Sequence, residues 1–337
     1  MSATTTGPET QGLSDETTVD PNSSTGKEIA GKSPMRIAMR RLFRDPIAVI
    51  CMVVILFFAL VAILAGPICA AFGVSPETQF ASQMLDFTTG WPVTGPPVHG
   101  FDPNHPLGIA PKTGDDNLAY WVYGARTSLT IAFVSTVVAS FLGVVVGLVA
   151  GFMGGVVDKM LSFVIDLFLT IPFLLAALTV QPIINQRFSL SDNYNTIQFV
   201  VLIGVLAFFG WMSVARLVRG EVLSLREREF VQAARVLGMP TRRILVKELL
   251  PNLAAPLIVA ISLMLPAFVT LEAGLAYLGI GVSGSPSWGR TIERAQPYFE
   301  SYPLYLWAPL LGIVLLVVAL NLLGDALRDA LDPKTRR

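Results

Sequence analysis

Long apolar runs separated by polar segments make up most of this chain. Six runs of about 20 mainly apolar residues are each long enough to cross roughly 30 Å of hydrocarbon. They span 47–65, 127–152, 160–181, 196–215, 254–271 and 304–324. Backbone N–H and C=O groups in lipid must form their hydrogen bonds within the protein, which favours helices. The sequence lacks the repeated segments of alternating hydrophobicity that are typical of a β-barrel. The predicted fold class is therefore an all-α polytopic membrane protein with six transmembrane helices.

Composition supports this interpretation and excludes several classes of function. Hydrophobic residues make up 53% of the 337 residues, charged residues only 14%, and the mean hydropathy is +0.62. A soluble domain carries about 25% charged residues, so the composition argues against a water-soluble enzyme. The formal net charge of zero gives no reason to expect a nucleic-acid partner.

The cysteines and histidines do not form a recognisable site. Cys51 and Cys69 would lie about 27 Å apart along a helix, too far for a disulfide. His99 and His105 lie in a proline-rich segment without further metal ligands nearby, so we expect surface histidines and no metal site.

Basic residues orient the spans. With the N-terminus inside, 19 of the 24 lysines and arginines fall in inside segments and five, Lys112, Arg126, Arg187, Arg290 and Arg294, fall outside. The positive-inside rule then predicts a cell-membrane protein with both termini cytoplasmic. No apolar stretch lies near the start, so no cleavable signal peptide is expected. The predicted parts are a disordered tail (1–34), an N-terminal segment with span one (35–66), an extracytoplasmic loop (67–126), a permease core (127–325) and a cytoplasmic tail (326–337).

The polar tail contains a match to the phosphate-loop pattern. Gly26 to Ser33 reads GKEIAGKS, but no apolar strand precedes it and Pro34 turns the chain away from helical geometry. A phosphate loop needs a strand before it and a helix after it. We therefore expect no nucleotide site in the tail.

The inside segment 216–252 carries the strongest local signals. Residues 221–237 have helical periodicity, with Leu223, Phe230, Ala233, Ala234 and Leu237 predicted to share one face. Gly238 follows where a helix end favours a left-handed residue, and Pro240 prevents continuation. Thr241 is predicted to cap a second helix that runs to about residue 250. A solvated hairpin and a docking element for a cytoplasmic partner are both consistent with this pattern, and the length of the loop favours docking.

Other candidate residues lie in the spans and in the outer segments. Gly143, Gly147 and Gly151 are spaced by four and predict close helix packing, within the subunit or against a partner. Glu272, Trp288 and Arg290 are candidates for the lining of a translocation path, although Trp288 could equally be an interfacial anchor. Asp166 interrupts the third run and favours a structural carboxylate over a proton relay. Pro172 could kink this span.

One segment resembles a known family. EFVQAARVLGMPTRRILVKELLPN, from Glu229 to Asn252, is similar to the EAA loop of ABC importer permeases, with Ala233, Ala234, Gly238, Leu250 and Pro251 in register. Gln232 replaces the usual glutamate of the motif, and Glu248 stands where many members have isoleucine. The segments 40–50, 123–129, 147–175, 278–292 and 321–334 resemble the C-type subunit of oligopeptide and dipeptide permeases. The outer segment 107–121 departs from the family pattern.

The resemblance implies a type I ABC importer permease without catalytic residues. It implies a B-type permease partner, two ATPase subunits that hold ATP and magnesium, an extracytoplasmic binding protein and a peptide substrate. The ATPase-coupling residues would be Glu229, Gln232, Ala233, Ala234, Gly238, Arg242, Arg243, Leu250 and Pro251. Two alternatives stay open: a permease for nickel or another small solute, and an ion-coupled secondary transporter that titrates Asp166 and Glu272.

Overall fold

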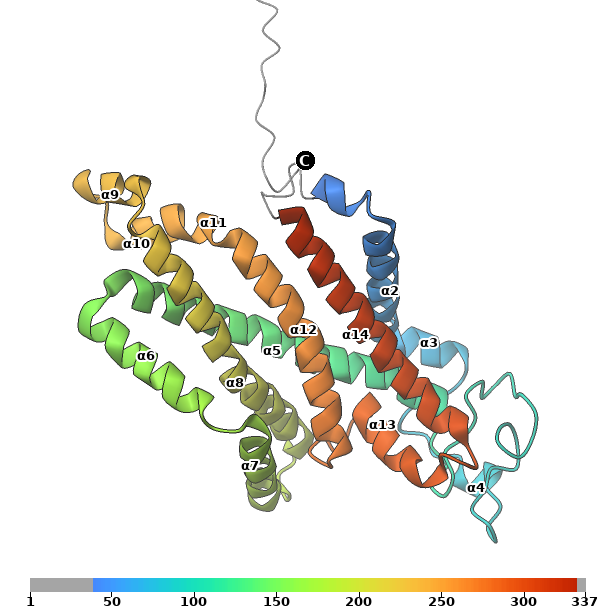
Figure 1. Ribbon diagram of the computed structural model, residues 1–337. Helices are drawn as coiled ribbons and strands as arrows, with labels where there is room; N and C mark the ends of the chain where they lie inside the picture. Colours follow the sequence, from blue (N-terminus) through green and yellow to red (C-terminus); the bar gives the residue numbers. More distant parts are fainter. Residues whose placement is uncertain (1–38, 332–337) are drawn as a thin grey trace, which may run out of the picture.

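The computed structural model describes residues 39–331, all of whose regular elements are helices (Figure 1). The predicted tail, its phosphate-loop match and the last six residues lie outside these residues. The helices are α2 (Pro46–Ile63), α3 (Ala65–Ala71), α4 (Ala81–Met84), α5 (Asn117–Met153), α6 (Gly155–Leu169), α7 (Phe173–Phe188), α8 (Tyr194–Leu225), α9 (Glu229–Val236), α10 (Thr241–Arg243), a π-helical turn (Ile244–Leu249), α11 (Leu250–Asn252), α12 (Ala254–Tyr277), α13 (Trp288–Ala295), a 3₁₀ turn (Gln296–Tyr298) and α14 (Pro303–Leu331).

Five of these helices, α2, α5, α8, α12 and α14, are long and apolar enough to cross a membrane. The third predicted span is different: α6 and α7 meet at a bend of 78° and count as a sixth span only when taken together. The third span is therefore broken into two helices, whereas the sequence indicated only a kink at Pro172. The break falls at residues 170–172, where Pro172 has an extended backbone and stands at the N-cap of α7.

Most of the other predicted spans are shorter than the helices that the structure contains. Helix α5 begins ten residues before the predicted start because the Asp116 carboxylate caps it by accepting a hydrogen bond from the Ala119 amide at 2.8 Å. The end of the predicted loop 67–126 is thus helical. Helix α8 continues to Leu225, and α14 takes in the first residues of the predicted tail 326–337.

Helix α5 lies at the centre of the bundle. It packs along α8 and also contacts α2, α12 and α14, which surround it (Figure 1). The main core is formed mainly by α2, α5, α8, α12 and α14 with the start of α13, and a second core lies between α8 and the α9–α11 segment. Short helices mark the two ends: α9–α11 lie at one end, and α4, α13 and the 67–116 segment lie at the other. Cys51 and Cys69 are buried and free, as expected.

Candidate functional site

The three spaced glycines form the contact between α5 and α8. Each of the three glycines faces one valine of α8, and successive valines lie one helical turn apart. A Cβ added at Gly143, Gly147 or Gly151 would lie 2.5–2.8 Å from the Cβ of its valine and 2.7–2.9 Å from a backbone oxygen of α8. These valines are Val214, Val218 and Val222. The packing seam predicted from the spacing is therefore internal to this subunit, and the alternative of a seam against a partner does not apply.

At the α9 end, the chain turns back through Gly238. Its φ of +73° is left-handed, and the Met239 amide donates to the Ala234 oxygen at 3.0 Å across the turn. An added Cβ would meet nothing within 4 Å. The backbone conformation alone therefore accounts for glycine at this position, as the sequence predicted.

The exposed face of this hairpin differs from the predicted one. Val231 and Ala234 point inward, whereas Val236 is 87% exposed and Leu237 82% exposed. The predicted shared face was wrong because Leu223 belongs to α8 and the chain breaks at 226–228 before α9 begins. The break resets the helical phase.

The second half of the hairpin is also less regular than predicted. Thr241 does not cap α10, since Pro240 occupies the cap position and no side-chain bond is made there. The chain then widens into a π-helical turn before α11. Pro251 has no amide hydrogen, and its ring would crowd the carbonyl four residues earlier, which a wider turn relieves.

Most of the predicted coupling residues lie on the surface of the hairpin. Glu229, Gln232, Ala233, Gly238, Arg242, Arg243 and Pro251 are exposed, Leu250 is half-buried, and Ala234 is buried. The residues that the sequence selected thus lie close together in the fold, around an apolar exposed patch.

The hairpin is tied to the bundle beneath it. Val231 and Ala234 pack in the second core with Ile244, Leu249 and the α8 residue Val222. The Arg226 guanidinium donates a 3.0 Å hydrogen bond to the Gly151 oxygen at the end of α5. These contacts connect the hairpin to the end of α8, and α8 to the end of α5.

Ion pairs join α6 to α8. The Arg219 guanidinium binds both carboxylate oxygens of Asp158, and Arg216 binds Asp166 at 2.6 Å. Asp166 thus has a structural partner, in agreement with the interpretation that the sequence favoured.

The opposite end contains a buried tryptophan cluster. Trp288 is fully buried, its Nε1 donates to the Trp121 oxygen at 2.9 Å, and its ring packs edge-on against Phe58. Gly124 and Gly312 leave the space that its ring occupies. The structure therefore gives Trp288 a core position, which is neither of the two positions considered from sequence.

Glu272 also lies inside the core. It is fully buried in α12, with the hydroxyl groups of Ser128 and Ser287 beside its carboxyl group. Neither it nor Trp288 lines the outer cavity described below, whereas Arg290 does. Of the three candidates for a path lining, only Arg290 therefore lies on the wall of this cavity.

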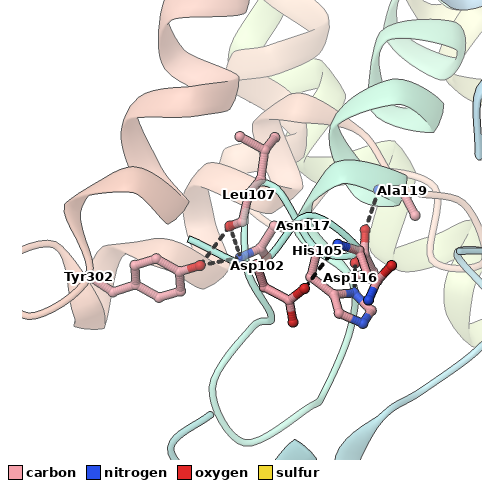
Figure 2. A network of polar contacts seen from close by, with 8 residues as sticks. Asp102, His105, Leu107, Asp116, Asn117, Ala119 and Tyr302 are labelled. Carbon is pink, nitrogen blue, oxygen red and sulfur yellow. Dashed lines mark hydrogen bonds and ion pairs between the residues drawn. The ribbon is translucent and has the colours of Figure 1, made fainter. Parts of the chain in front are cut away.

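A polar network fixes the chain before α5 (Figure 2). The His105 ring Nδ1 lies 2.6 Å from an Asp116 oxygen, and both side chains are buried. Tyr302 donates to the Leu107 oxygen at 2.6 Å and accepts from the Asn117 amide at 3.0 Å. Burial raises the pKa of the Tyr302 phenol, which stays protonated and can donate. The expectation of a surface histidine at position 105 was wrong.

A cavity of about 540 Å³ lies between the first turns of α5 and helix α13, and it is named here the outer cavity. Its wall includes three arginines, Arg126, Arg290 and Arg294, and one acid, Glu77. Arg294 pairs with Asp115 at 3.3 Å. The cavity combines these charges with aromatic and hydroxyl side chains, a lining that can bind a small polar ligand.

Comparison with known proteins identifies the family. Residues 143–337 match the family described as binding-protein-dependent transport system inner membrane component. Residues 33–86 match the N-terminal transmembrane domain of oligopeptide transport permease C. The chain belongs to this family of ABC importer permeases. It is a multi-pass membrane component of a transport system, as the EAA-loop resemblance predicted.

Sequence similarity to two relatives extends over almost the whole length of the permease. The oligopeptide transport system permease protein OppC of Mycobacterium tuberculosis H37Rv is 34% identical over 302 residues, which is 89% of this chain and 94% of the relative. The dipeptide transport system permease protein DppC of Alkalihalophilus pseudofirmus is 31% identical over 321 residues, 95% of this chain and 96% of the relative.

A solved structure supports the fold. The inward-facing MetNI methionine ABC transporter contains a chain that matches the permease with a TM-score of 0.50 at 21% identity, covering 63% of this chain and 96% of the other. This likeness agrees with the type I importer permease fold predicted from sequence.

Sequence reasoning missed the polar residues of the permease that precede α5. Asp115 and Asp116 stand directly before an apolar helix that Asn117 begins, which is the signature of a helix start. That signal was available in the sequence. The partner Tyr302 lies 185 residues away from Asn117 and could not be found from local pattern.

Proposed function

We propose that this chain is the C-type permease subunit of an ATP-driven importer of oligopeptides or dipeptides. A second, B-type permease would complete the translocation path, and a binding protein would deliver the peptide from outside. Two ATPase subunits on the cytoplasmic side would bind ATP and magnesium. The names of the two relatives support the substrate class, and the excess of arginine and lysine at the α9 end supports cytoplasmic termini.

The observation that carries the proposal is the apolar surface of the α9 hairpin. Val236 and Leu237 are exposed beside the left-handed turn at Gly238, while the inner face of α9 is buried against α8. Apolar groups exposed at the tip of a polar loop are typical of a surface that another protein covers. The arginines around them, Arg242 and Arg243, can pair with acids on that protein.

Contacts of the described residues support a route for the coupling. Closure of the ATPase dimer would displace α9, whose buried face is packed on α8. The glycine seam and the Arg226 bond hold α8 and α5 together, so both helices would tilt as one unit. A tilt of these two long helices would alternate access to the path between the two permeases.

A charge placed on the turn tests this assignment. Gly238→Asp adds backbone strain of about 1 kcal/mol and a carboxylate that must lose water on docking. We expect the subunit to insert and pair, but ATPase co-purification and peptide uptake to fall together. Ala233→Glu should act in the same way, because Ala233 is exposed on the same hairpin.

The matched control is Gly73→Asp. Gly73 is also left-handed, with φ of +67° and nothing within 4 Å of an added Cβ, but it follows α3 at the opposite end. It should retain both uptake and ATPase binding. Wild-type uptake by Gly238→Asp with the ATPases bound would show that the hairpin only connects two spans.

Orientation is tested by labelling. Cysteines replacing the exposed Phe87 and Leu190 should react with an impermeant thiol reagent added outside intact cells, and one replacing Leu237 should not. Cys51 and Cys69 are buried and would be replaced in the background. The reverse pattern would overturn the assignment of cytoplasmic termini.

A further inference from the structure

Positive charge in the outer cavity exceeds the negative charge available to balance it. Arg294 is paired with Asp115, but neither Arg126 nor Arg290 makes an ion pair within residues 39–331. The acid on the same wall, Glu77, is exposed and makes no ion pair there either. Two guanidinium groups therefore face this cavity without a carboxylate partner from the described chain.

Arg290 is held in a position that leaves its charge poorly compensated. Its Nη1 reaches the Val282 oxygen only at 3.4 Å, and its buried Nε has no hydrogen-bond partner among the described residues. Burial, together with the nearby charge of Arg294, lowers the pKa of Arg290, and the charge of Glu293 offsets this only in part. A bound anion would relieve both effects, since it would accept the free hydrogen bonds and balance the charge.

Helix α13 adds to this positive environment. It begins at Trp288, and the preceding residues Ser285 to Ser287 line the same cavity. The N-terminal end of a helix carries a partial positive charge. The helix start and the two unpaired arginines thus act on the same cavity.

We propose that the outer cavity binds the C-terminal carboxylate of the transported peptide, with Arg290 and Arg126 as its contacts. This inference rests on the proposed function and names the part of the substrate that the permease recognises. A guanidinium binds a carboxylate through two parallel hydrogen bonds. Every peptide carries this group whatever its side chains are, so recognition here would not depend on peptide sequence.

The size and lining of the cavity favour a short peptide over a protein surface. Its volume of about 540 Å³ lies in the range of small-ligand sites, roughly 300–1,000 Å³. Arg290 is half-buried in the wall and does not protrude, so a flat acidic surface would reach it poorly. Tyr123 and Phe199 provide apolar contacts for a peptide, and the Glu77 carboxylate can bind the N-terminal ammonium group of that peptide.

The test compares two substrates in the complete transporter. The importer, reconstituted in vesicles with its ATPases and binding protein, is supplied with radiolabelled trialanine or trialanine amide at limiting concentration. We expect Arg290→Gln to reduce uptake of the free acid about tenfold and to change uptake of the amide less than about twofold. Ratios of variant to wild type are compared for each peptide, so any preference of the binding protein cancels.

Matched variants separate charge from structure. Arg290→Lys should recover part of the free-acid uptake, because it keeps the charge but loses the paired hydrogen bonds. Arg126→Gln should show the same selective loss, and its exposed side chain makes it safe for folding if Arg290→Gln does not assemble. Arg187→Gln, an exposed arginine at the end of α7, should affect neither peptide.

The other results would overturn the inference. Equal loss for both peptides, with weaker association of the binding protein, would make the outer cavity a protein docking site. No loss for either peptide would exclude a role for these arginines. If the wild-type transporter moves neither peptide while it moves another solute, the proposed peptide function itself fails, and the two failures are thereby distinguished.

Discussion

The α9 end of the permease leaves apolar side chains exposed, whereas the α13 end encloses polar ones. Val236 and Leu237 project from a hairpin that is held only by its inner face, but His105, Asp116, Asn117 and Tyr302 are buried and bonded to one another. Exposed apolar groups stabilise little until a partner covers them, while a buried polar network is costly to disrupt. The first end thus presents apolar surface, which we propose a partner covers, and the second end is held in shape by its buried hydrogen bonds.

The largest effect on stability is expected at Asp116. Asp116→Ala removes the cap of α5 and leaves the buried His105 ring without its carboxylate, which together should lower the free energy of unfolding by about 2–4 kcal/mol. Asp116→Asn keeps a capping oxygen and should recover part of the loss. Thermal unfolding of the purified complex measures both, and unchanged stability in the alanine variant would remove the network from this account.

A smaller effect is expected at Tyr302. Tyr302→Phe keeps the ring but removes the hydroxyl that bonds Leu107 and Asn117, so two hydrogen bonds are lost while the Asn117 amide still donates to the Leu107 oxygen. The expected loss is about 1–3 kcal/mol. Tyr298→Phe, half-buried outside this network, is the control and should unfold like the wild type.

Features that depend on neighbouring residues could be predicted from the sequence, whereas contacts between distant residues could not. The apolar runs located the five spanning helices and the broken third run, and the turn at Gly238 was predictable because its signals, Gly238 and Pro240, lie two residues apart in the chain. The bend of the third span was underestimated at Pro172, since a proline predicts a kink but not its angle. The core position of Trp288 depends on Gly124 and Gly312, which are distant in sequence, and no local pattern reveals such contacts.

The smallest effect on stability is expected at the α9 end. Leu237→Ser changes a side chain that is 82% exposed, so the free energy of unfolding should shift by no more than about 0.5 kcal/mol. The same change should weaken ATPase binding, because it removes apolar surface from the exposed tip of the α9 hairpin. A large stability loss without any change in ATPase binding would reverse the contrast between the two ends.

Site-specific photo-cross-linking of the assembled transporter tests the central claim most directly. A photoreactive amino acid is placed at Leu237 in the α9 hairpin or at Phe87, which is 86% exposed at the opposite end. The account predicts adducts with the ATPase subunit from position 237 and none from position 87. ATPase adducts from position 87, or none from position 237, would contradict it.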